Sequence, residues 1–294
     1  MGFPGGFTVL MALYHGDRPE LFDQAIHSVF SNTLLPDDFV VVVDGPIHEQ
    51  LESAVNKIQS QYPLIQFIFL PKNQGLAYAL NIGLELVKTE WVARADADDI
   101  NLPKRFEIQA NIIIKNPQIQ LLGSSILEVD QNGSPLAIRE MPCSESEIRK
   151  FARRRNPFNH MSVVYRTNVV RACGGYPHIF LKEDYGLWSL LLARNVRAMN
   201  TDHILVHASA GMEMFRRRGG LRYAKSEWAM QKLLIQCGLK GSWSAILDGC
   251  IRATFFLIPS RIRGFFYLRF CVNLSRRIVI HLSQRGILNC TMLR

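Results

Sequence analysis

The sequence has no cysteine pattern that would indicate a disulfide framework or a zinc site. Its six cysteines are scattered, without a Cys-x-x-Cys pair and without histidines at zinc-finger spacing. In a chain of 294 residues, such cysteines indicate buried or incidental thiols kept in a reducing compartment. The hydrophobic content of 48% is that of a globular protein with one large core, or with a main domain and a smaller appendage.

Targeting and membrane-spanning patterns are also missing. Residues 1–6 show no basic segment followed by an apolar one, so we expect no signal peptide. No uncharged run approaches the roughly 18–20 residues that a membrane-spanning helix needs. We therefore expect a cytoplasmic protein, held at most on the surface of a membrane.

Acidic residues are absent from residues 249–294, which hold eight arginines among phenylalanines and aliphatic residues. The whole chain carries 34 basic and 25 acidic residues, a formal charge of +9, which favours an anionic partner. Basic and aromatic residues together are typical of a helix lying on an anionic bilayer. The alternative is a helix that packs on the main domain with its arginines in solvent. Nucleic acid is not expected as a partner, because the sequence has no helix-turn-helix, aromatic RNA-binding signature or zinc module.

The first hundred residues alternate between short apolar runs and amphipathic segments. Strands are predicted at residues 8–14, 39–43, 66–70 and 91–95, and helices at residues 19–31, 49–60 and 75–87. This alternation predicts an α/β fold with a parallel sheet. Since the strands are almost continuously apolar, helices should cover both faces of the sheet.

The second hundred residues mix the same elements less regularly. Helices are predicted at residues 103–115, with Pro103 in first position, at 144–153, with Ser144 and Glu147 as a capping pair, and at 183–194. Strands are predicted at residues 120–129 and 162–165. The alternation fades by about His207. We therefore expect one domain over residues 1–210 and a basic loop with a helical extension over residues 211–294.

Four residues with three carboxylates, Asp96-Ala97-Asp98-Asp99, follow the fourth predicted strand. Ligands of parallel α/β sheets gather at the carboxyl ends of the strands. Because three carboxylates on one short loop repel each other, the cluster favours a hard divalent cation, Mg²⁺ or Mn²⁺, which also takes phosphate oxygens. One alternative is a solvated acidic loop that caps the next helix. A phosphohydrolase with an aspartyl nucleophile is disfavoured, since its acidic motif usually follows the first strand.

The order and spacing of these segments resemble one known family. Residues 7–34, 41–46 and 71–99 are similar to family 2 glycosyltransferases, and the similarity extends over roughly residues 7–220. The resemblance implies the GT-A fold, a central, mostly parallel sheet flanked by helices, here with a C-terminal helical extension. The sequence resembles most strongly the bacterial enzymes that build O-antigen or exopolysaccharide repeat units, such as the amylovoran-type enzymes.

The resemblance places the donor half of the site in residues 1–100. Asp44 would contact the uracil or ribose of a UDP-sugar, although many relatives carry two acids where this chain has Asp44-Gly45. Asp98 and Asp96 would hold Mn²⁺ or Mg²⁺ at the donor diphosphate, and Asp96 is also placed to face the ribose. Other residues expected at the nucleotide-sugar are Ala12, Tyr14, Asn73, Arg94 and Ala97. Simple alternatives are core packing for Tyr14 and a helix N-cap for Asn73.

The acceptor half is implied at residues 101–210. Asp184, in the segment Glu183-Asp184, would be the general base that takes the proton of the acceptor hydroxyl. Glu183, His160 and Asp99 would support it or contact the acceptor. The alternatives are that both acids of the pair cap the following helix and that His160 is structural. Arg216 and Arg217, followed by Arg218, would lie over the diphosphate, unless they form a solvated turn or contact lipid phosphate.

These residues together imply an inverting glycosyltransferase. It would move a hexose or N-acetylhexosamine from a UDP-sugar to a sugar on a polyprenyl diphosphate, at the inner face of the cell membrane. The Gln-x-x-Arg-Trp motif of processive synthases is absent, so one sugar is expected to be added per encounter. The alternatives are a soluble or protein acceptor, and a scaffold protein that binds a nucleotide-sugar without turnover.

Overall fold

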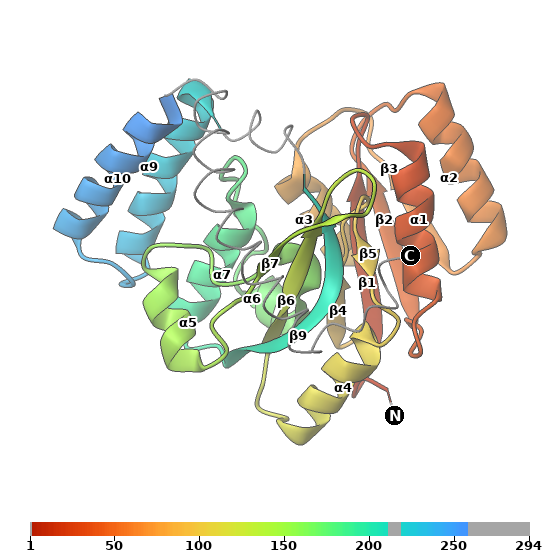
Figure 1. Cartoon of the computed structure of the whole chain (residues 1–294), viewed down its shortest axis with the longest axis horizontal. Helices are drawn as coiled ribbons and strands as arrows, with labels where there is room; N and C mark the ends of the chain where they lie inside the picture. Colours follow the sequence, from red (N-terminus) through yellow and green to blue (C-terminus); the bar gives the residue numbers. More distant parts are fainter. Residues whose placement is uncertain (1, 211–218, 258–294) are drawn as a thin grey trace.

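A single mixed sheet runs through the protein (Figure 1). The computed structural model describes residues 2–210 and 219–257, and within them nine strands are ordered β3-β2-β1-β4-β8-β6-β9-β5, with β7 beside β6. The strands are β1 (Phe7–Leu13), β2 (Asp38–Val43), β3 (Ile65–Phe69), β4 (Trp91–Arg94), β5 (Ile100–Asn101), β6 (Leu121–Val129), β7 (Pro135–Arg139), β8 (Val164–Arg166) and β9 (Ala198–Ser209). The helices are α1 (Pro19–Phe30), α2 (Glu49–Gln61), α3 (Leu76–Leu86), α4 (Arg105–Lys115), α5 (Glu145–Ala152), α6 (Thr167–Ala172), α7 (Glu183–Ala193), α9 (Gly220–Gln236) and α10 (Ser242–Leu257), with a 3-10 turn η1 at His160–Ser162.

The first four strands are parallel, in the order β3-β2-β1-β4. The predicted strands and helices of this half are confirmed to within one residue at each end. Beyond β4 the sheet is mixed, because β8 runs antiparallel to both β4 and β6, whereas β9 runs parallel to β6. The expected parallel arrangement therefore describes the first half of the sheet and not the whole.

Alternate residues of the parallel strands enter two separate cores. Val9 and Met11 of β1 pack on one face with α1, α2 and α4, whereas Leu10 packs on the other face with α3 and α7. In β2 the same alternation sends Val41 to the first core and Val40 and Val42 to the second. Because a strand buried on both faces has no solvent side, nearly every residue of β1 and β2 is apolar.

The second half contains the elements that the sequence did not predict. β9 is a twelve-residue strand that pairs with β6 over its whole length and, near its end, with the short strand β5. Helix α4 begins at Arg105 and not at Pro103, because residues 103–104 form a turn closed by the bond from Arg105 N to Leu102 O (2.9 Å). The capping box of Ser144 and Glu147 at the start of α5 is confirmed.

Two long helices at the end of the described chain pack on each other at one edge of the molecule, opposite α1 and α2 (Figure 1). These helices, α9 and α10, contact the rest of the protein mainly through α7. No helix in the described ranges combines the length and the apolar content needed to cross a bilayer. Residues 258–294, which carry most of the predicted membrane-surface segment, lie outside the described residues, and the proposed domain division at residue 210 stays a prediction.

Candidate active site

The acidic loop at the end of β4 is held in place by the end of β9. Ser209 N donates to Asp99 Oδ1 (2.8 Å), and Ser209 Oγ donates to the backbone carbonyl of Asp98 (2.7 Å). The end of β4, just before the loop, is fixed by Arg105 of α4, whose guanidinium donates to the backbone carbonyl of Arg94 (2.7 Å). Residues from β4, α4 and β9 thus position one loop, although they are far apart in sequence.

Charge is concentrated and buried at this loop. Arg94, with an exposed fraction of 1%, forms an ion pair with Asp96, which is partly exposed. Burial alone would lower the pKa of Arg94, but the carboxylates of Asp96 and Asp99 raise it overall. Burial, followed by repulsion from Asp98 and Asp96, raises the pKa of Asp99 well above its usual range. The loop therefore gathers three carboxylates beside two buried guanidinium groups, those of Arg94 and Arg105.

Two polar atoms at this loop are buried and have no hydrogen-bond partner among the described residues. They are Asp99 Oδ2 and Arg94 Nε. Because buried polar atoms in native proteins are nearly always paired, unpaired ones at the end of a strand indicate a place for a ligand. An anionic oxygen would suit Arg94 Nε, and a cation or hydroxyl would suit Asp99 Oδ2.

The residues of the loop fit a hard divalent cation in chemistry, since they offer only carboxylate oxygens. In the described ranges, no group of three or more histidine, cysteine, aspartate or glutamate side chains is arranged as a complete metal site. An ion such as Mg²⁺ takes one or two protein carboxylates and completes its shell with substrate phosphates. Asp98 is partly exposed, whereas Asp96 already faces Arg94.

Asp44, at the end of β2, caps helix α3. Its Oδ1 accepts from Gln74 N and its Oδ2 from Gly75 N, both at 2.8 Å, and its side chain is almost fully buried. Asn73 donates to the backbone carbonyl of Asp44 (3.0 Å) and is not the N-cap, which is Gly75. The fold thus uses both carboxylate oxygens of Asp44 at the positive end of α3, where an anion is favoured.

The single acid at this position has a structural reason. Gly45 has a φ of 88°, and a Cβ there would collide with the backbone nitrogen of Asn73. A second acid at position 45 would need a different turn. Ala12 and Tyr14, at the end of the neighbouring β1, are both partly exposed, and Tyr14 N donates to Asp17 Oδ2 (2.8 Å).

Glu183 and Asp184 begin helix α7. Asp184 accepts from its neighbour Tyr185 N (2.7 Å) and from Asn156 Nδ2 (2.5 Å). Burial first, and then the Asp184 carboxylate, raise the pKa of Glu183 to about 7, with a smaller rise from Asp96 and an opposing effect of Arg94. The acid pair and the acidic loop are linked through β8, because Tyr165 pairs with Val92 of β4 and packs on Trp188 of α7.

His160, in the turn η1, is largely buried in an aromatic cluster. Its Nε2 lies 3.2 Å from the hydroxyl of Tyr176, and Trp188 packs at its edge. Burial, together with the charge of Arg94, lowers the pKa of His160 well below its usual range. A neutral histidine of this kind supports the wall between the acidic loop and α7, and its acceptor role stays a prediction.

Sequence reasoning missed the residues that hold the predicted ones. Asn156 and Ser209 are ordinary polar residues whose partners, Asp184 and the acidic loop, are distant in the chain. Lys182 is another: its ammonium lies 2.9 Å from the carboxylate of Glu227 on α9, and both are buried. Arg216 and Arg217 lie outside the described residues, so their role stays a prediction.

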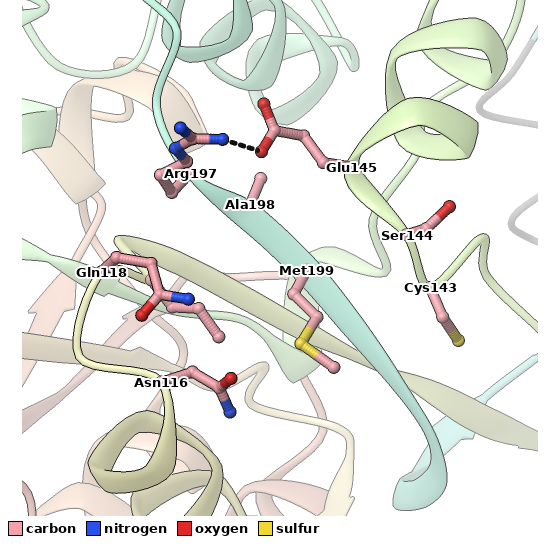
Figure 2. Close-up of a pocket in the computed structure, with 9 residues that line it drawn as sticks. Asn116, Gln118, Cys143, Ser144, Glu145, Arg197, Ala198 and Met199 are labelled. Atoms are coloured by element: carbon pink, nitrogen blue, oxygen red, sulfur yellow. Dashed lines mark hydrogen bonds and ion pairs between the residues drawn. The ribbon is translucent and has the colours of Figure 1, made fainter.

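A separate pocket of about 620 Å³ lies between the end of α4, the start of β9 and the start of α5 (Figure 2). Arg197 and Glu145 form an ion pair at its rim (3.0 Å). Through the pairing of β9 with β6, β6 with β8 and β8 with β4, the pocket lies beside the beginning of β4. The acidic loop follows the other end of that strand. None of the predicted site residues lines this pocket.

Comparisons with known proteins decide the family. The model for "Glycosyl transferase family 2" matches residues 8–180. This chain belongs to glycosyltransferase family 2. The glycosyltransferase is 36% identical over 261 residues to the amylovoran biosynthesis glycosyltransferase AmsE of Erwinia amylovora, covering 89% of the chain and 97% of that protein. It is 34% identical to the UDP-Gal:alpha-D-GlcNAc-diphosphoundecaprenol beta-1,3-galactosyltransferase of Escherichia coli, covering 89% and 94% respectively.

Solved structures agree on the fold. The structure of S. aureus TarS 1-349 in complex with UDP-GlcNAc matches with a TM-score of 0.62 at 16% identity, over 91% of this glycosyltransferase and 77% of that chain. The mannosyltransferase PcManGT from Pyrobaculum calidifontis in complex with GDP-Man and Mn²⁺ matches with a TM-score of 0.61 at 14% identity, over 96% and 81% respectively. The expected GT-A fold and the expected enzyme class are confirmed.

Proposed function

We propose that this glycosyltransferase moves a hexose or N-acetylhexosamine from a UDP-sugar to the hydroxyl of a lipid-diphosphate-linked sugar, one sugar per encounter and with inversion. The observation that carries the proposal is the packing of α7 on the strand beside β4. Tyr165 of β8 pairs with Val92 of β4, and its ring lies 6.3 Å from that of Trp188 on α7. The effects of Asp96 and Arg94 on the pKa of Glu183 agree with donor and acceptor groups that border one space. Transfer between two bound substrates requires such an arrangement.

Asp184 serves as the general base. It accepts the proton of the acceptor hydroxyl while that oxygen forms a bond to the anomeric carbon. The bond from this carbon to the UDP oxygen breaks, and its electron pair leaves with the diphosphate. Attack opposite the leaving group inverts the carbon. Asn156, at 2.5 Å from Asp184 Oδ2, keeps the base in one orientation, which supports this role.

Asp98, with Asp96, would hold Mn²⁺ or Mg²⁺. The all-carboxylate donor set and the unpaired Asp99 Oδ2 support a cation here. When bound, the ion supplies positive charge beside the diphosphate as negative charge develops on it. Arg94 Nε, buried and without a hydrogen-bond partner among the described residues, would donate to a phosphate or ribose oxygen. Asp44 supports the nucleotide end by fixing the turn between β2 and α3.

The relatives support the proposed class of acceptor. One relative acts on a GlcNAc-diphosphoundecaprenol acceptor, and another belongs to amylovoran biosynthesis. We therefore place the enzyme in O-antigen or exopolysaccharide synthesis, at the cytoplasmic face of the membrane. A soluble or protein acceptor is the competing possibility that the experiment below separates.

The test is a panel of UDP-sugars with a synthetic lipid-diphosphate sugar and with the same sugar free in solution. Asp184→Asn should lower kcat by roughly 10²–10⁴ while UDP binding is kept, as expected for loss of a general base. Asp202→Asn, at a side chain with 90% exposure, is the matched control and should keep full turnover. Chelation with EDTA should abolish turnover, and Mn²⁺ or Mg²⁺ should restore it. Full turnover of Asp184→Asn, or equal use of the free sugar, would contradict the assignment.

A further inference from the structure

The hairpin of α9 and α10 exposes a row of large apolar side chains on α10 and a tryptophan, Trp228, on α9. On α10, Trp243 is 86% exposed, Leu247 62% and Ile251 60%, at a spacing of four residues. Residues four apart lie on one side of a helix, so these side chains form one face. We call this face, together with Trp228 of α9, the outer face of the hairpin; its residues are Trp228, Trp243, Ile246, Leu247, Ile251 and Phe255.

The two helices pack closely on each other through Gly249, which lies on the side of α10 turned away from Leu247 and Ile251. Gly249 of α10 lies against the ring of Trp228, and a Cβ at Gly249 would meet that ring at 2.8 Å. The opposite sides of the helices are buried: Met230 and Leu234 of α9 pack on Tyr185 of α7. A soluble surface seldom gathers this many large apolar side chains unless it binds something.

The charges around the outer face are positive. Lys225 and Lys232 are exposed on α9, on the side that carries Trp228. The acids of the two helices are already paired with lysines, Glu227 with Lys182 at 2.9 Å and Asp248 with Lys240 at 2.5 Å. A basic helical surface with exposed tryptophan fits the boundary of an anionic bilayer, where aromatic rings enter the interface and lysines meet the headgroups.

We propose that the outer face of the α9–α10 hairpin docks on an anionic lipid bilayer. Charge complementarity selects this occupant over two others. Residues 258–294 hold seven arginines and no acidic residue, so they would bring positive charge to a positive face. A second copy of the chain, with a formal charge of +9, would do the same. The predicted membrane segment at residues 249–294 thus extends back through α10 and α9.

The hairpin is tied to the acid pair, which gives the docking a consequence. Lys182, directly before Glu183, lies 4.4 Å from the ring centre of Tyr223 and 2.9 Å from the carboxylate of Glu227, both on α9. Docking the hairpin would therefore fix the height and orientation of Asp184 relative to the bilayer. This suits an acceptor presented at that surface, although the docking itself depends on no particular donor or acceptor.

The test uses the full chain and sedimentation with vesicles, without substrates, so that its outcome is separate from that of the transferase assay. Vesicles of phosphatidylcholine and phosphatidylglycerol should bind the protein, and vesicles of phosphatidylcholine alone should bind it much less. Leu247→Glu should weaken partition into vesicles by about tenfold or more, because it puts a charge where docking would bury an apolar side chain in the bilayer. Leu35→Glu, at an equally exposed leucine in the loop before β2, should bind like the parent protein.

Tryptophan fluorescence locates the contact. Trp91 and Trp188 are fully buried, so Trp243 and Trp228 report on the outer face. Brominated phosphatidylcholine in the vesicles should quench emission, and Trp243→Phe should remove most of that quenching. Binding without quenching would place the contact elsewhere and overturn the proposal. So would a Trp243 emission that is already shifted to the blue without vesicles and unchanged by them, or a dimer in sedimentation velocity that Leu247→Glu dissociates.

Discussion

Glu183 is expected to make the protein less stable as the pH rises through neutrality. Burial and the neighbouring Asp184 raise the pKa of Glu183 to about 7 from the model-peptide value of 4.5. Between these two values the native state binds a proton that the unfolded state has lost. Stability therefore decreases with rising pH in this window. Below the lower value both states are protonated, and the contribution is fully present.

The magnitude follows from the difference between the two pKa values. At 1.36 kcal/mol for each unit, ionised Glu183 costs about 3 kcal/mol above neutral pH. Glu183→Gln removes the titration, so the variant should gain about 3 kcal/mol relative to the parent between about pH 5 and about pH 8. Urea unfolding followed by circular dichroism at both pH values measures the difference.

The control is Glu85→Gln at an exposed position of α3, which should leave the pH dependence of stability unchanged. Asp99, whose pKa is also raised by burial, is present in all three proteins and cancels in the comparison. If the free-energy difference between parent and Glu183→Gln were the same at both pH values, the burial argument for Glu183 would be refuted.

Two further predictions concern residues that hold the site together. Asp44→Ala removes the acceptor of Gln74 N and Gly75 N, and should lower stability by about 1–2 kcal/mol; UDP binding should fall with it, and unchanged thermal unfolding would contradict the capping role. Lys182→Met leaves the Glu227 carboxylate without its main cation in a buried setting, and should cost about 3 kcal/mol in urea unfolding. The double variant Lys182→Met/Glu227→Leu should recover much of that loss, because no buried charge remains unpaired.

The first half of the fold could be predicted from the sequence because its elements are local. A run such as Phe39–Val43 is apolar throughout, which only a strand covered on both faces requires. Helix α3 likewise follows from its own apolar pattern, and its N-cap is Gly75. The second half depends on pairing between distant segments. β9 includes Asp202 and His203, which fall at an irregularity in its register with β6, and it shows no clean alternation. Its pairing with β6 could therefore not be recognised from its own residues.

The same distinction applies to the site. The acidic loop and the pair Glu183-Asp184 stand out because carboxylates gather where an apolar strand ends or a helix begins. The residues that orient them do not stand out, since Asn156, Ser209 and Lys182 acquire their roles only through contacts with segments far along the chain. Neither periodicity nor composition carries this information.

The dependence of the two acidic sites on each other is a consequence of burial. Arg94 is a buried cation that acts on both the acidic loop and the acid pair. It pairs with Asp96, and it opposes the rise in the pKa of Glu183. Its Nε makes no hydrogen bond to any residue that the structure describes. In water the interaction between these charges would be screened. In a buried setting, a charge added at the acidic loop acts on the acid pair. A diphosphate bound at Arg94 would compete with Asp96 and Glu183 for the same guanidinium. Donor binding would then reduce the stabilisation of ionised Glu183, so that the acid pair retains its proton more firmly once the donor is in place.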